Sequence, residues 1–136
     1  MKKKKQKKII FIQDCGIYSN EIIVAANAEK KDIIAFLKKQ KIKKEGLKWI
    51  EKEEKAFEVF KQNNALVAHS DGRFMLLLRA VEDCWDYWEC LLHELNHIVW
   101  YIARGKMFQE EMEAQAYLQE HLFHKIRRKL MGIDKI

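Results

Sequence analysis

Two histidines one helical turn apart are the residues of this chain best suited to metal chemistry. They belong to the segment His93-Glu94-Leu95-Asn96-His97, which has the pattern HExxH. Positions i and i+4 of a helix share a face, so both imidazoles can reach one Zn²⁺ at about 2.0–2.1 Å. Glu94 lies roughly 100° around the helix axis, where its carboxylate can touch a metal-bound water without ligating the metal. This pattern is typical of zinc hydrolases.

A third protein ligand is needed, because a catalytic zinc usually takes three and leaves one position for water. The helix after the turn at Arg104-Gly105 is the expected donor, since a short turn folds it back antiparallel to the first. Its candidate ligands are Glu110, Glu111, Glu113, Glu120, His121 and His124. Spacing does not by itself choose among them, although Glu113 lies at a distance from His97 that returns the chain toward the metal.

The motif and the segment after it resemble a known family. HELNH followed by Glu113-Ala114-Gln115-Ala116-Tyr117 is similar to the small gluzincin-type zincins of phages and mobile elements, which have HExxH, a short connection and then ExxAY. The resemblance covers roughly Trp88–Leu122. A strand-rich segment before the HExxH helix is also similar to that family and to the ImmA/IrrE and SprT-like groups.

The resemblance implies a zinc metallopeptidase that hydrolyses a peptide bond in a peptide or protein substrate. The two histidine ligands fall on His93 and His97, the general base on Glu94 and the glutamate ligand on Glu113. The ImmA/IrrE pattern is ExxAN, and in that register the glutamate falls on Glu111, which is therefore the alternative third ligand.

The expected mechanism follows from these roles. Zinc would lower the pKa of its bound water toward about 7, and Glu94 would take the proton and pass it to the leaving amine. The oxyanion needs a donor, for which Tyr117, His121 and His124 are unranked candidates. An extended substrate would lie along an edge strand. Arg73–Ala80 is the best strand for this, although its apolar character fits a central strand equally well.

The elements that must position these residues follow from hydrophobic periodicity and turn residues. Strands are expected over 8–13, 21–26, 65–69 and 73–81, the last two joined by Ser70-Asp71-Gly72. Helices are expected from an N-cap at Asn27 to about Gln40, over Leu47–Gln62, from an N-cap at Glu82-Asp83 to Arg104-Gly105, and over Phe108–Leu130. The last should bury Met112, Ala116, Leu122, Phe123 and Ile126. The sequence predicts one zincin-like α+β domain over 9–136, with a small mostly antiparallel sheet packed on four helices.

The basic charge of the chain is concentrated at its start. The net charge is +6 over 136 residues, and six lysines lie within residues 1–8. We expect this segment to be a disordered tail, with a contact to RNA or DNA as the alternative. The alternative function for the whole chain is a non-catalytic module, in which zinc is structural or absent and the tail contacts nucleic acid or a partner.

The apolar runs and the cysteines of the chain indicate its compartment and redox state. No apolar run is long enough for a membrane span or a signal peptide, so we expect a cytoplasmic protein that does not bind membranes. Cys15, Cys84 and Cys90 lack CxxC spacing and are expected as free thiols. Cys90, three residues before His93, is expected to be a small buried residue, with a role as an extra ligand as the alternative.

Overall fold

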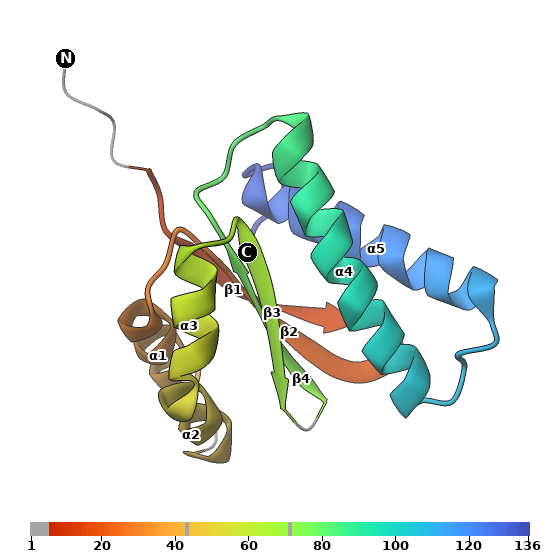
Figure 1. Ribbon diagram of the computed structural model, residues 1–136, viewed down its shortest axis with the longest axis horizontal. Coiled ribbons are helices and arrows are strands. Elements are labelled where there is room, and N and C mark those ends of the chain that lie inside the picture. The colour runs from red at the N-terminus through yellow and green to blue at the C-terminus, as the bar shows by residue number, and fades with distance from the viewer. Residues whose placement is uncertain (1–5, 43, 71) are drawn as a thin grey trace.

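The computed structural model describes residues 6–42, 44–70 and 72–136, and it has a sheet with helices on both faces. The strands are β1 (Ile9–Cys15), β2 (Tyr18–Ala26), β3 (Ala65–Ser70) and β4 (Arg73–Leu78). Helices α1 (Lys30–Lys39), α2 (Lys44–Lys52) and α3 (Glu54–Lys61) lie on one face, and α4 (Trp85–Gly105) and α5 (Met112–Leu130) lie on the other, as Figure 1 shows. The predicted α+β class is confirmed.

The sheet is mixed, with the strand order β1-β2-β4-β3. The β1–β2 and β3–β4 pairs are antiparallel, whereas β2 and β4 are parallel from Glu21↔Arg73 to Ala26↔Leu78. The parallel pair is sterically accessible because three helices and β3 separate the two strands in sequence, which gives the chain room to cross over. Both edges of β4 are paired and the strand ends at Leu78, so the segment 73–80 that was predicted as a docking edge contains a central strand instead. The edges of the sheet are β1 and β3.

Side chains of the central strands alternate between two cores. Ile22, Val24, Ala26, Phe74, Leu76 and Leu78 face α4 and α5, while Ile23, Ala25, Met75 and Leu77 face α1, α2 and α3. The alternation is the two-residue period of a strand. A strand buried on both faces reads as a continuous apolar run, which explains why this part of the sequence lacks an in/out pattern.

The helix predicted over Leu47–Gln62 is two helices in the structure. The chain leaves the helical conformation at Glu53, which has φ −84° and ψ 69° and separates α2 from α3. The described residues therefore contain five helices where the sequence predicted four. The bend keeps Ile50 on the core beside β2 and β4 while α3 turns toward β3.

The start of α1 also differs from the prediction. Its N-cap is Glu29, whose side chain forms a capping box with Asp32. Asn27, predicted as the N-cap, has a φ of 57°, and its backbone N–H donates to Leu78 O at 3.0 Å. Asn27 therefore closes the end of the parallel pair instead of starting the helix.

The HExxH helix ends at Gly105 as predicted and begins after Cys84, not after Glu82-Asp83. Asp83 accepts a hydrogen bond from Trp88 Nε1 at 2.7 Å, so its carboxylate fixes an indole and does not cap the helix. In α5, Leu122 and Ile126 are buried as predicted. Met112 is 82% exposed and Ala116 is also exposed, because Phe108–Glu111 is a turn and the buried face of α5 starts only at Leu118.

The first described residues of the chain contact Asn27 and Asp32. The expected tail over 1–8 falls largely on residues 1–5, which lie outside the described residues. Asn27 Nδ2 donates to Gln6 O at 3.0 Å, and Lys8 forms an ion pair with Asp32 at 3.1 Å.

None of the helices in the described residues has the length and apolar content that a membrane span requires.

Candidate functional site

The two histidines of HExxH lie together on the solvent-exposed face of α4. His93 Nε2 and His97 Nε2 are 3.2 Å apart, and the ring planes cross at 83°. Two nitrogens about 2.0–2.1 Å from one tetrahedral zinc lie about 3.3 Å apart, so this pair has the separation that the metal requires. The same distance permits a hydrogen bond between two neutral imidazoles, one donating and the other accepting.

The position of the pair follows from the pattern of α4. Its buried stripe includes Leu91, Leu95, Ile98, Val99 and Ile102, which pack on the sheet and on α5. The histidines occupy the positions that this stripe leaves free, and half-buried Glu94 lies beside them. Because a well-packed apolar stripe fixes the rotation of the helix, it also fixes the direction of both imidazoles.

Two hydrogen bonds and one cation–π contact hold the N-terminal turns of α4. Trp88 donates to Asp83, and Arg127 of α5 stacks on the same indole, 5.0 Å from the ring centroid. The Tyr87 hydroxyl donates to Arg79 O at 3.0 Å, and burial raises the pKa of that phenol. These three contacts fix the position of the helix ahead of His93.

The predicted third ligands are not brought to the histidine pair. Gln119 Nε2 donates to Leu92 O at 3.3 Å, so this face of α5 is the one that meets the HExxH segment. Glu113 is exposed and lies about 120° around α5 from Gln119. Glu111 is exposed at the N-cap position, before the helix begins. Within the described ranges, no group of three His, Cys, Asp or Glu side chains is close enough to hold a metal.

The three candidate oxyanion donors lie together, but on α5 alone. Tyr117, His121 and His124 line a shallow cavity of about 340 Å³, together with Glu120 and Lys125. A Cβ on Gly16 would lie 4.0 Å from His121 Nε2, so His121 faces the β1–β2 turn. No α4 residue lines this cavity, and the donor role stays a prediction.

One aromatic contact near the pair was missed by the sequence reasoning. His69 of edge strand β3 packs on Tyr101, with ring centroids 4.1 Å apart, and both line a cavity of about 380 Å³. Tyr101 lies one turn beyond His97, so its i+4 spacing placed it on the same side of α4. The approach of β3 depends on long-range strand pairing, which that spacing does not reveal.

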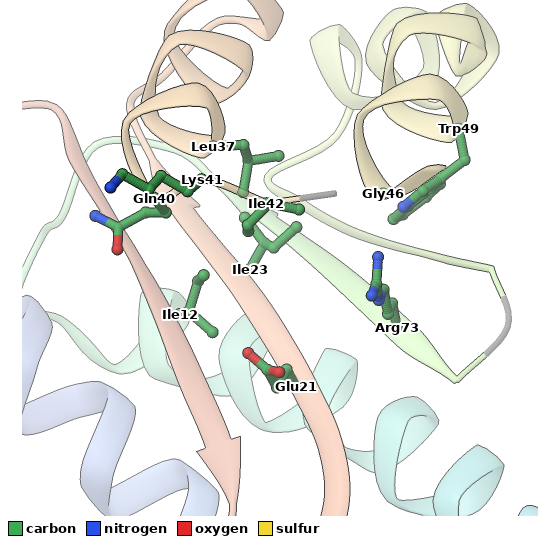
Figure 2. A pocket seen from close by; sticks show the side chains of 10 residues that line it. All are labelled: Ile12, Glu21, Ile23, Leu37, Gln40, Lys41, Ile42, Gly46, Trp49 and Arg73. Atoms are coloured by element: carbon green, nitrogen blue, oxygen red, sulfur yellow. The ribbon is translucent and has the colours of Figure 1, made fainter. Parts of the chain in front are cut away.

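In the described residues, Cys15, Cys84 and Cys90 are free thiols, as the sequence predicted, and Cys90 is half-buried. Another cavity, of about 340 Å³, lies between the sheet and helices α1 and α2, and Figure 2 shows the side chains that line it. Ile12, Ile23 and Leu37 form its apolar floor, and Arg73 lies on its far side near Trp49. It belongs to the face opposite α4 and has no part in the histidine site.

Comparison of the chain with protein-family models, with curated proteins and with solved structures finds no match.

Proposed function

We propose that the chain is a zinc-dependent metallopeptidase in which His93 and His97 hold the metal and Glu94 is the general base. The observation that carries this proposal is the 3.2 Å separation of the two Nε2 atoms on the exposed face of α4. Exposure matters because a metal and a peptide must both reach the site, and a buried pair would admit neither.

The roles of the protein groups follow from general chemistry. Bound zinc supplies Lewis acidity at the solvent side of α4. The Glu94 carboxylate accepts a proton from the attacking water and later donates it to the leaving amine. Because Glu94 is only half-buried and lies on a helix fixed by its core contacts, its carboxylate stays within reach of that proton.

The third ligand is proposed to be Glu113, with Glu111 as the alternative. Either assignment requires the connection 106–111 and the first turn of α5 to change arrangement. In the structure, Gln115 Nε2 holds this connection by donating to Phe108 O at 3.2 Å and to Gln109 O at 2.9 Å. These are exposed or partly buried contacts, which cost little to exchange for metal ligation.

A peptide substrate fits the edge of the sheet beside α4. Strand β3 is an edge strand and contacts α4, so its unpaired backbone groups are available to an extended peptide. His69 and Tyr101 would border that peptide at the His97 end of the site.

Zinc content tests the proposal first. Wild-type protein is dialysed against zinc-containing and then metal-free buffer, and its metal is measured by mass spectrometry. We expect one zinc per chain, lost in His93→Ala and in His97→Ala. The matched control His69→Ala removes an exposed histidine of β3 that is not a proposed ligand, and it should keep the metal. A wild type without stoichiometric zinc, or full retention in His93→Ala, would refute the site.

Two further variants separate catalysis from structure. Glu94→Gln should keep its zinc and lose cleavage of a peptide library by about 100-fold or more, since it removes the general base. Glu113→Gln and Glu111→Gln compare the two third ligands, because only the true ligand should weaken zinc binding. If chelation unfolds the protein and neither the wild type nor Glu94→Gln cleaves the library, the zinc is structural and the non-catalytic alternative is correct.

A further inference from the structure

A large cleft lies outside the carboxyl ends of the two parallel strands. Its volume is about 1010 Å³, and none of its lining residues belongs to α4 or α5. The segments 27–31 and 78–80, which follow β2 and β4, line it together with one side of α3. In Figure 1 this is the end of the sheet at which the N-terminal segment enters and α3 ends. Ligands of open sheets often bind outside the carboxyl ends of parallel strands.

The lining of this cleft is basic. Its cationic side chains are Lys8, Lys30, Lys31, Lys61 and Arg79, against the carboxylates Glu29 and Glu82. Glu29 pairs with Lys31 at 3.4 Å, and Glu82 pairs with Arg79. Lys8 pairs in the same way with Asp32 at 3.1 Å. Lys30 and Lys61 are therefore the lining cations that form no ion pair among the described residues, and they give the cleft its positive charge.

Two aromatic rings lie among these cations. Phe57 and Phe60 lie three residues apart on one face of α3, half-buried and packed partly against the core, so only part of each ring is accessible from the cleft. Lys30 Nζ lies 6.0 Å from the Phe57 ring centroid. The Arg79 guanidinium lies over the Tyr87 ring, 5.1 Å from its centroid, and pairs with Glu82, so it is a fixed part of this wall.

The most basic stretch of the sequence ends with residues 6–8, two of which lie at the rim of the cleft. Gln6 and Lys8 line it, and Asn27 holds Gln6 by the hydrogen bond to its carbonyl. The residues before Gln6 include Lys2, Lys3, Lys4 and Lys5. Beyond residue 8 the chain is close to neutral, so the basic character of this region comes from this stretch and from the lining lysines.

We propose that this cleft binds single-stranded nucleic acid, with phosphates against its lysines and bases against Phe57 and Phe60. A groove that combines cations with accessible aromatic surface is the usual arrangement for single strands. An acidic peptide would use the charges and leave the two rings unused. A duplex keeps its bases stacked on one another, so it cannot use the rings either.

The test is fluorescence anisotropy of the full chain with a labelled oligothymidylate of about 16 nucleotides. We expect Lys30→Gln with Lys61→Gln to weaken binding roughly tenfold and to reduce the salt slope by about 1.4, at about 0.7 per phosphate contact. Lys38→Gln with Lys39→Gln removes the same charge from α1 outside the cleft and should leave binding close to wild type. Equal affinity of the two double variants would mean that the N-terminal lysines bind alone, and would overturn the proposal.

Stacking is tested separately from charge. Phe57→Leu should weaken binding about fivefold or more while the salt slope stays unchanged, with circular dichroism confirming that the variant is folded. Polyglutamate of the same charge and the matching duplex should each compete about tenfold less well than the unlabelled single strand. Equal competition by either polyanion would contradict a site for single strands. Because none of these residues touches His93, His97 or Glu94, a negative result leaves the zinc proposal unaffected.

Discussion

The roles of single residues depend on how local their geometry is. The His93–His97 pair needs only the pitch of one helix, so its HExxH spacing was sufficient to predict that the two rings converge. The third ligand needs a second helix at a defined rotation. Glu113 and Glu111 differ by two positions, about 200° around that helix, and the sequence has no local signal that fixes which of them faces the pair.

Cys15 illustrates a residue whose environment was not visible in the sequence. It is buried at the end of β1, and burial, reinforced by the charges of Asp14 and Glu21, raises the pKa of its thiol from 9.0 to about 12. The folded state therefore binds this proton more tightly than the unfolded state. The resulting stabilisation is fully present below about pH 9 and is lost as the pH rises toward 12.

We expect the urea midpoint of the wild type to fall more steeply between about pH 9 and pH 11 than that of Cys15→Ala. The variant should start from a lower midpoint, because the removed sulfur leaves a small cavity. Parallel pH profiles for the two proteins would show that Cys15 does not retain its proton on folding.

At the scale of elements, the ends of helices were easier to predict than the break between α2 and α3. The apolar stripe Leu47, Ile50, Phe57 and Phe60 continues across the break, and no glycine or proline marks it. Glycine lies at both helix ends that the sequence located, but Gly105 is still helical and the left-handed residue after α4 is Met107, with a φ of 61°. Gly132 follows α5 with a φ of 72°, and its N–H donates to Lys129 O while Ile133 N–H donates to Arg128 O, which is a Schellman motif.

The two terminal glycines should respond in opposite directions to alanine. Gly132→Ala should lower the free energy of unfolding by about 1–2 kcal/mol, since a Cβ is disfavoured in the left-handed region. Gly105→Ala lies at the last helical position of α4 with no positive φ and open space around it, so it should be neutral or stabilise by up to about 1 kcal/mol. Chemical denaturation of both variants measures the difference, and equal effects would exclude strain at Gly132 as the cause.

At the scale of the whole molecule, the sequence predicted both hairpins and the helical segments, but not how the hairpins join. Local turn residues specify which neighbours pair, whereas the β2–β4 contact joins strands that are about 50 residues apart and depends on burying both faces of each. The apolar runs of β2 and β4 indicate that each strand is buried on both faces, but they do not indicate which strand it pairs with. The parallel pair creates the cleft, and it also makes β3 the edge that lies beside α4.

The same central strands should make the two cores one cooperative unit. Leu76 and Leu77 are neighbours on β4, both fully buried, and they point into opposite cores. Leu76→Ala and Leu77→Ala should each lower the free energy of unfolding by about 2–5 kcal/mol. Leu66→Ala, on edge strand β3 and only half-buried, is the control with a smaller loss. In each variant, far-UV circular dichroism and tryptophan fluorescence should follow a single transition, because β2 and β4 cannot lose one core and keep the other. Two separated transitions in Leu77→Ala, with α4 and α5 surviving the loss of α1, α2 and α3, would show that the faces of the sheet fold independently.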